Sequence, residues 1–338
     1  MKIQKSNLIQ ALEKVKPGLS SKELIQQSTS FAFLEGCVVT YNDEISISHP
    51  VEGLEITGAV QATELYQLLK KLKQEEISLE VSENEILITS GKTKAGLTLQ
   101  TEIKLPLSEV ERKSKWKTLP EGFKDALRFA VSACSKDMSK PVLTCVHVNQ
   151  EGFVEACDNY RVARWTLEGE FPTGTFLIPQ SSVLELLKLE PVKVALDGGW
   201  IHFITEDKTM MSCRVIDDSF PNTEKLLGVS GAEVSLPEGI TEVLDRAGIF
   251  AKRDSALDED VTIVLDKGKV RIESKSETGW FKEEVDSDYS GEILKFDVTP
   301  SLLKGILQET SVFSHCGRML KFESGNWKYV VSLRGGGK

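Results

Sequence analysis

A short repeated segment constrains the fold of this chain more than any other feature of its sequence. Leu119-Pro120-Glu121-Gly122 recurs as Leu236-Pro237-Glu238-Gly239, about a third of the 338 residues further on. Each copy precedes a stretch with apolar residues at helical spacing, and segment 6–16 has the same pattern. There Ser6 is the expected N-cap, and Pro17-Gly18 is the expected end of the helix. Such self-similarity indicates three copies of one structural unit.

Every third of the chain also contains a second amphipathic helix and alternating β-patterns around turn residues. Because each helix has a single apolar stripe to bury, it must pack on a sheet. We therefore predict an α+β fold of three repeated domains, each with two helices packed on antiparallel sheets. The domains are expected at 1–118, 119–235 and 236–338, with connectors at 112–117 and 228–232. The second helices are expected at 62–73, 180–189 and 300–308, and the clearest hairpins at 77–90, 194–205 and 261–274.

The composition is that of a folded globular chain, with 40% hydrophobic and 27% charged residues. No segment approaches the roughly 18 apolar residues of a membrane span, and the N-terminus lacks the apolar core of a signal peptide. We therefore expect a cytoplasmic protein without a membrane partner. Its six cysteines are widely spaced without a Cys-x-x-Cys pair, which predicts neither a disulfide framework nor a zinc site.

The charge is unevenly distributed. The chain carries a net charge of −10, which excludes an ordinary basic nucleic-acid-binding domain. The six expected helices are nevertheless net positive, with bases off the apolar stripe at Lys14, Lys70, Lys71 and Arg128, among others. These bases either belong to solvated helix faces or form a mildly positive surface that holds phosphates weakly and without sequence preference.

No motif predicts catalysis or a cofactor. Ser90-Gly91-Lys92-Thr93 is similar to the end of a phosphate-binding loop, but Ile86 stands where that motif requires its first glycine. The four histidines are far apart, and neither a zinc-hydrolase helix motif nor a Gly-x-Ser-x-Gly elbow is present. We predict no catalytic residue, no metal ligand and no cofactor. An enzyme with an acidic site remains the least favoured alternative.

Several segments, in order along the whole chain, resemble one protein family. Ala156–Ala163 resembles the "ATDGHRLA" signature of the bacterial β sliding clamp, the processivity subunit of DNA polymerase III. Lys136–Thr144 is similar to the clamp's "RPVLTG" segment, and Ser212–Pro221 to its "SKLIDGRFPDY". Ile178-Pro179 opens a Leu-rich helix like the clamp's "VPRK" helix. The ordered set identifies the chain as a divergent, or phage-encoded, member of this family.

The resemblance implies a DNA sliding clamp without catalytic activity. Three-domain protomers would form a head-to-tail homodimer, a six-domain ring around duplex DNA that tethers the replicative polymerase. A ring holds DNA topologically, so a net charge of −10 is compatible with this function. Lys22, Lys136 and Lys140 match the family's DNA-facing residues, and helix-face reasoning adds Lys14, Lys70 and Lys71. A cytoplasmic, nucleoid-associated location follows.

The resemblance also implies a pocket that binds short linear peptides of the polymerase, the clamp loader and other partners. Aliphatic walls would bury the peptide's anchor side chains, and polar groups would fix its register. The family's C-terminal "MPMR" run, one rim of that pocket, is replaced here by Ser332–Lys338. The matching positions are Leu143, Cys157, Asn159, Tyr160, Arg161, Val162, Pro221, Lys225, Leu226, Val330 and Val331.

The dimer interface is expected between the first and third domains. Ile249 and Phe250, with Arg246 nearby, match the family's third-domain side, and Leu97 matches a first-domain partner. Ala95 stands where some clamps have a large aromatic residue, so ring closure is expected to be weaker unless Phe250 fills the space. The alternative function is a clamp-fold interaction or decoy protein that binds replication partners without encircling DNA.

Overall fold

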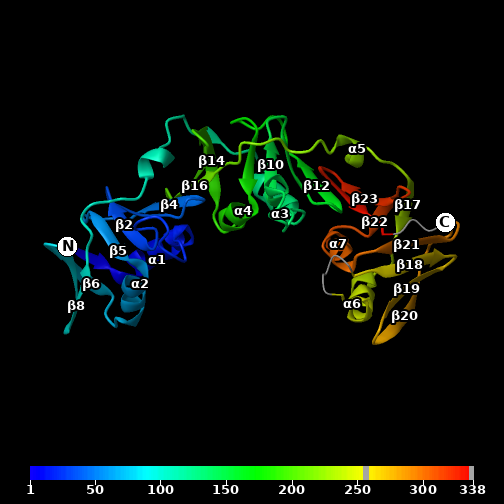
Figure 1. The fold of residues 1–338 in the computed structure, drawn as a ribbon, viewed down its shortest axis with the longest axis horizontal. Helices are drawn as coiled ribbons and strands as arrows, with labels where there is room; N and C mark the ends of the chain where they lie inside the picture. The colour runs from blue at the N-terminus through cyan, green and yellow to red at the C-terminus, as the bar shows by residue number, and fades with distance from the viewer. Residues whose placement is uncertain (254–258, 335–338) are drawn as a thin grey trace. The chain divides into compact units, whose positions relative to one another are not determined.

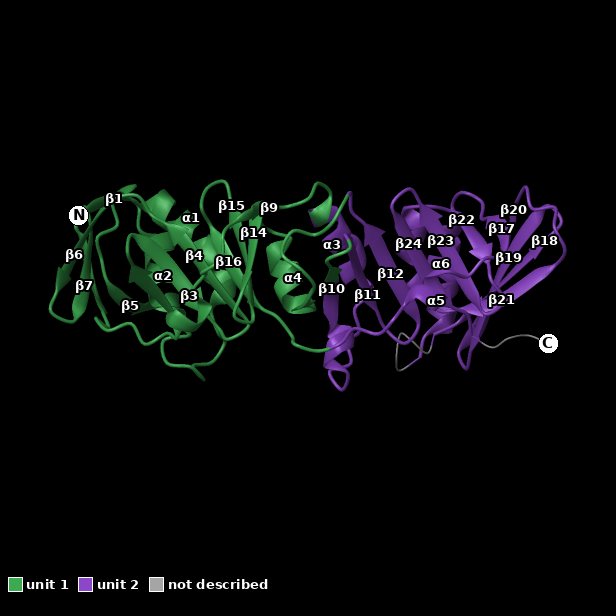
Figure 2. Ribbon diagram, turned by 90° about the horizontal axis from the view of Figure 1, so that it is seen from above, with its two compact units in different colours: residues 1–123, 148–151, 169–218 green, residues 124–147, 152–168, 219–338 purple. Residues whose placement is uncertain are grey.

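The computed structural model describes residues 1–253 and 259–334. Its contacts divide the chain into two compact units, drawn in different colours in Figure 2. Each unit combines separate stretches of the chain, so neither coincides with one of the three predicted domains. The division into three domains stays a prediction. Unit 1 comprises 1–123, 148–151 and 169–218, and unit 2 comprises 124–147, 152–168 and 219–338.

Unit 1 contains two antiparallel sheets. In one the strand order is β1-β6-β7-β8, and in the other it is β5-β2-β3-β4-β16-β15-β14-β9. The pairing of β4 with β16 joins 45–48 to 210–213 in one sheet. The strands of these two sheets are β1 (Lys2–Gln4), β2 (Ser30–Leu34), β3 (Cys37–Tyr41), β4 (Ile45–Pro50), β5 (Gly58–Gln61), β6 (Glu76–Ser82), β7 (Glu85–Ser90), β8 (Thr93–Thr98), β9 (Lys117–Thr118), β14 (Pro191–Asp197), β15 (Trp200–Thr205) and β16 (Met210–Arg214). Strand β13 (Phe176–Pro179), also in unit 1, belongs to neither of them.

The helices of unit 1 bury one apolar stripe each. Helices α1 (Lys5–Val15) and α2 (Ala62–Lys71) lie side by side against the larger sheet (Figure 1), and α4 (Gln180–Leu186) follows β13. Leu8, Leu12 and Val15 of α1 are buried at the helical spacing that the sequence shows. Short 3₁₀ turns occupy η1 (Lys16–Gly18) and η2 (Leu107–Val110).

The prediction of Ser6 as an N-cap is wrong. Helix α1 begins at Lys5, so that Gln4, two residues before Ser6, is the N-cap and makes no side-chain capping bond. The backbone N–H of Ser6 donates to the Glu75 carboxylate at 2.7 Å. The Glu75 carboxylate, from a distant segment, thus accepts from one of the free N–H groups in the first turn. The Ser6 hydroxyl was expected to do this.

Unit 2 also contains long antiparallel pairings. Strands β11, β12, β24, β23, β22 and β17 lie side by side in that order, and a second sheet has the order β20-β19-β18-β21. Helix α6 packs on β18, β19 and β20, next to α7. The elements are α3 (Phe123–Val131), η3 (Pro141–Thr144), β10 (Cys145–Asn149), β11 (Phe153–Cys157), β12 (Arg161–Thr166), α5 (Glu224–Leu227), β17 (Ala232–Ser235), α6 (Ile240–Ala251), β18 (Val261–Asp266), β19 (Lys269–Ser276), β20 (Gly279–Asp286), β21 (Leu294–Val298), α7 (Pro300–Lys304), η4 (Ile306–Gln308), β22 (Val312–His315), β23 (Met319–Ser324) and β24 (Trp327–Ser332).

The predicted helices and hairpins are confirmed at their expected places. The three predicted hairpins correspond to β6-β7, β14-β15 and β18-β19, and the six expected helices to α1, α2, α3, α4, α6 and α7. Helix α5 was not predicted. In the described part of the chain, no helix is long and apolar enough to span a membrane. Within the same residues, no three His, Cys, Asp or Glu side chains lie where they could hold a metal ion.

Candidate functional site

Unit 2 contains a small apolar cluster that is separate from the main sheet cores. Cys157 of β11, Val162 of β12, Leu227 of α5 and Val330 of β24 form its buried centre. Val162 and Val330 lie opposite each other in the pairing of β12 with β24. We call this group the pocket cluster. Its partly buried members, which pack against the centre, are Leu143, Phe220, Val229 and Met319.

Four of the predicted pocket residues meet in the pocket cluster, namely Leu143, Cys157, Val162 and Val330. Val331 is fully buried and follows Val330 along β24, so its side chain points to the other face of the sheet. Three of the remaining predicted pocket residues, Pro221, Lys225 and Leu226, are exposed beside the cluster.

Leu227, and not Leu226, is the buried leucine of α5. Leu227 is 2% exposed, whereas Leu226 is 43% exposed. This difference could not be predicted, because a four-residue helix is too short to show a periodic apolar pattern.

The turn between β11 and β12 places Asn159 and Tyr160 at the rim of this region. The carboxylate of Asp158 accepts hydrogen bonds from the backbone N–H groups of Tyr160, at 2.8 Å, and of Arg161, at 2.9 Å. The Asn159 side-chain oxygen accepts a hydrogen bond from Lys140 Nζ at 3.1 Å. Lys140, which was predicted to face DNA, therefore contacts the turn that belongs to the predicted peptide pocket.

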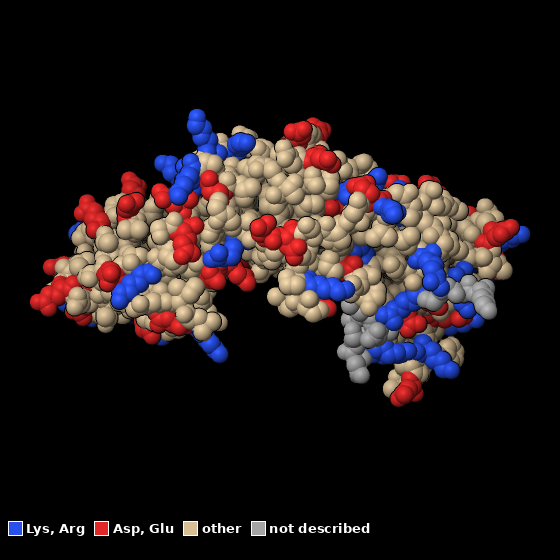
Figure 3. Space-filling model, turned by 45° about the horizontal axis from the view of Figure 1, so that its top comes forward, with Lys and Arg blue, Asp and Glu red and all other residues tan. Residues whose placement is uncertain are grey.

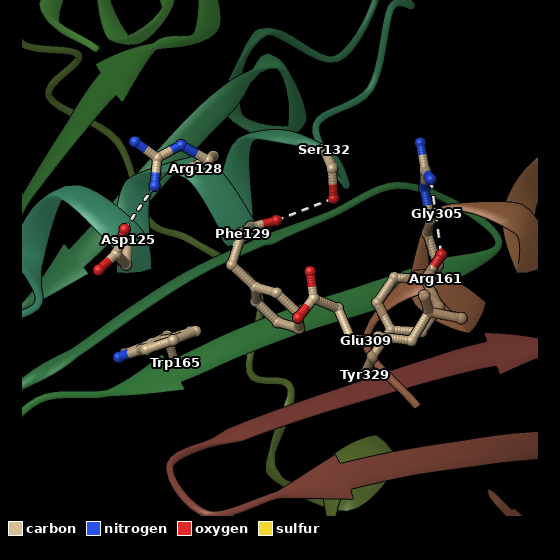
Figure 4. A pocket seen from close by; sticks show the side chains of 10 residues that line it. Asp125, Arg128, Phe129, Ser132, Arg161, Trp165, Gly305, Glu309 and Tyr329 are labelled. Carbon is tan, nitrogen blue, oxygen red and sulfur yellow. Dashed lines mark hydrogen bonds and ion pairs between the residues drawn. The ribbon is translucent and has the colours of Figure 1, made fainter. Parts of the chain in front are cut away.

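The Arg161 side chain lies on the opposite face of β12 from Val162, in a cavity of about 350 Å³ (Figure 4). The aromatic rings of Phe129, Trp165 and Tyr329 line this cavity, and Tyr329 Oη donates to a backbone carbonyl at 2.8 Å. Burial raises the pKa of Tyr329, so the phenol stays protonated at neutral pH. The walls can hold a planar or apolar group, and Asp125, Arg128 and Glu309 add charged groups to the lining.

The predicted DNA-contacting lysines differ in their surroundings. Lys14 pairs with Asp207, and Lys70 lies 3.6 Å from Glu13 and over the Tyr66 ring. Burial acts to raise the pKa of Asp207, but hydrogen bonds from Lys14 and neighbouring threonines hold it far below its usual value. Figure 3 shows lysines and arginines interspersed with carboxylates on the face drawn there. The remaining predicted lysines, Lys22, Lys71 and Lys136, are exposed.

The predicted interface residues lie at or beside the last strands of two sheets. Ala95 and Leu97 are half-buried on β8, the end strand of one sheet of unit 1. In unit 2, Ile249 of α6 is 59% exposed, and the Phe250 ring stacks on Phe281 of the end strand β20 at 6.4 Å between centroids. End strands carry backbone groups that are free to pair with another chain.

Two further groups complete the candidate interface in unit 2. Arg246 forms an ion pair with Glu283 of β20, with Nε 2.9 Å from Oε2. Trp280, on the same strand, is 70% exposed. Trp280 was not predicted, although Trp280 and Lys282 alternate with Phe281, as in a strand with one solvent-facing side.

Comparisons with known proteins point to one group. Residues of this chain match the "Beta sliding clamp" of Lactococcus lactis with 28% identity over 167 residues, 45% of this chain and 44% of that protein. They match that of Rickettsia felis with 24% identity over 235 residues, 65% of this chain and 60% of that protein. The matches thus span about half the length of these relatives. No protein-family model matches the chain.

The similarity to solved structures covers almost the whole chain. DNA polymerase III subunit beta from Pseudomonas aeruginosa superposes with a TM-score of 0.86 at 19% identity, over 98% of this chain and 99% of that one. The corresponding chain from Streptococcus pneumoniae gives a TM-score of 0.85 at 21% identity, over 98% of both chains. The predicted fold and the resemblance to the β sliding clamp are confirmed.

Proposed function

We propose that this chain is a DNA sliding clamp that encircles duplex DNA as a head-to-tail homodimer and tethers the replicative DNA polymerase. The single observation that carries the proposal is the agreement of nearly the entire chain with a DNA polymerase III beta subunit, at a TM-score of 0.86. It acts without catalysis, as an accessory subunit. The three-domain division, 1–118, 119–235 and 236–338, is part of this proposal.

Weak, nonspecific contact with DNA suits a ring. A chain with a net charge of −10 cannot hold duplex DNA tightly by phosphate neutralisation. Exposed Lys22, Lys71 and Lys136 supply positive charge, whereas the pairing of Lys14 and Lys70 with carboxylates reduces theirs. Topology therefore retains the DNA, and the lysines ease loading and sliding.

The pocket cluster is the proposed docking site for partner peptides. Its aliphatic and thiol side chains fit an apolar anchor of a short peptide from the polymerase or the clamp loader. Exposed Lys225, Leu226 and Asn159 surround the cluster with groups that can set the peptide's register. The residues that would replace the family's C-terminal rim include 335–338, which lie outside the described residues.

Ring closure is proposed to join β8 of one protomer to α6 and β20 of its partner. Ile249 is exposed and Phe250 is half-buried, so both can contribute apolar surface to the proposed interface. Leu97 and the small Ala95 offer the apolar surface of β8, and the stacked Phe250 and Phe281 rings add area on the other side.

A threading experiment on linear DNA tests the proposal without a loader. The protein is incubated with a linear duplex that carries biotin at both ends, and streptavidin is added either after or before the protein. A ring threads over free ends, so we expect retention in high salt only when the ends are blocked after the protein is added. Retention that is independent of this order, or no retention in either order, would contradict encirclement.

A further inference from the structure

A buried carboxylate on β11 joins several side chains into one polar network. Glu155 is 2% exposed. Its Oε1 lies 2.9 Å from His147 Nδ1, and its Oε2 accepts hydrogen bonds from Thr223 Oγ1 at 2.7 Å and from Arg164 Nε at 3.0 Å. A buried carboxylate is tolerated when a cation and hydrogen-bond donors surround it, as here.

The network contacts the segment 220–227 at Phe220, Thr223 and Glu224. Arg164 donates from Nη2 to Thr223 Oγ1 at 2.8 Å, pairs through Nη1 with Glu224 and lies 4.1 Å from the centre of the Phe153 ring. The His147 ring stacks on Phe220, with 4.8 Å between the centroids. Glu155 therefore touches this segment directly at Thr223 and through its two neighbours at Phe220 and Glu224.

The same segment forms one wall of the pocket cluster. It contributes Phe220 and Leu227 to the cluster and carries the exposed pocket residues Pro221, Lys225 and Leu226. Its one regular element, α5, has four residues and no side-chain N-cap bond. A helix of that length is not stable by itself, so its position depends on tertiary contacts.

We propose that Glu155, with Arg164 and Thr223, positions the wall 220–227 and so keeps the partner-peptide pocket formed before a partner binds. None of the three is proposed to touch the peptide. Such preorganisation lowers the ordering cost of binding, because the wall need not be fixed when the peptide arrives. The inference rests on the proposed function only in calling the pocket cluster a partner site.

Cys157 provides a reporter inside the pocket cluster. It is 5% exposed, and burial, with the negative charges of Glu155 and Asp158, raises its pKa to about 12, so it reacts only when the cluster opens. Cys134 and Cys145 are buried in the same unit outside this cluster and serve as internal references. The full-length chain is pulsed with N-ethylmaleimide, and mass spectrometry follows the alkylation of each cysteine.

The matched variants are Thr223→Val and Thr223→Ser. Valine removes the hydroxyl that bonds Glu155 and Arg164 but leaves those two paired, whereas serine retains it. We expect Thr223→Val to accelerate alkylation of Cys157 by at least about tenfold, the equivalent of one or two lost hydrogen bonds, with Cys134 and Cys145 unchanged. Thr223→Ser is expected to react at the wild-type rate, and Glu155→Gln faster than Thr223→Val.

Two results would overturn the proposal. One is an unchanged Cys157 rate in Thr223→Val, and the other is an equal rise at Cys157, Cys134 and Cys145, which would indicate a general loss of stability. The labelling requires neither DNA nor a partner. A protein that fails the threading experiment but shows the local effect would therefore refute the sliding clamp and leave the positioning network standing.

Discussion

Neutralising Glu155 tests how much the buried network contributes to the free energy of unfolding. Glutamine at position 155 keeps the side-chain volume but leaves the Arg164 guanidinium, whose side chain is 13% exposed, without its buried counter-ion. Breaking a buried ion pair from one side costs about 3 to 5 kcal/mol. We therefore expect Glu155→Gln to lower the free energy of unfolding of unit 2 by that amount at pH 7. Urea unfolding, with hydrogen exchange of β11 to assign the transition to unit 2, measures the loss.

The same variant predicts a pH dependence with a defined sign. Burial acts to raise the pKa of Glu155, but hydrogen bonds from His147 and Thr223 and the charge of Arg164 hold it below the ordinary value. A carboxyl with a depressed folded-state pKa stabilises the protein above its unfolded pKa of about 4.3 and loses that contribution as the pH falls through the folded value. The difference between wild type and Glu155→Gln should therefore shrink below about pH 4.

A matched control is Asp125→Asn, which breaks an exposed ion pair with Arg128 in the same unit, away from the proposed interface. Because solvent screens this pair, its loss is expected to cost about 1 kcal/mol or less. A stability loss in Glu155→Gln no larger than that of the control at pH 7 would contradict a strong buried ion pair. A loss that persists unchanged down to pH 3 would contradict the depressed pKa of Glu155.

Two further predictions concern ring closure and DNA contact. Replacing Ile249 and Phe250 together by alanine should convert the dimer to monomers, because two apolar anchors of about 2 kcal/mol each are lost. Light scattering measures the solution mass. The control Ile293→Ala, at a residue that is 69% exposed elsewhere in unit 2, should remain dimeric. A persisting dimer would refute the interface assignment. Changing Lys22 and Lys136 to glutamate should reduce severalfold the amount of protein that threads onto free-ended DNA at low salt and is retained once the ends are blocked, without changing the solution mass. An unchanged yield would remove both from the proposed DNA-facing set.

The sequence was sufficient where structure depends on local periodicity. Helix α1 was predicted because Leu8, Leu12 and Val15 repeat at the spacing of one helix face, and the structure buries all three. The predicted hairpins were confirmed for a similar reason, since alternation and turn residues specify them within a dozen residues. The N-cap of α1 was missed because Glu75, far along the chain, meets the N–H of Ser6.

The candidate site was predictable only in part, because its chemistry comes from residues that are distant in sequence. The resemblance supplied Cys157, Val162 and Val330, which meet in the pocket cluster. It could not supply the bond between Glu155 and Thr223, 68 residues apart, because no local pattern links a strand carboxylate to a loop hydroxyl. Nor could helix-face reasoning show that Asp207, 193 residues away, pairs with Lys14.

Two copies of this chain are proposed to close into a ring, and light scattering coupled to size exclusion, over a range of protein concentrations, measures whether they do. The expected solution mass is twice the 37.5 kDa of one chain. A mass of 37.5 kDa at every concentration would contradict it.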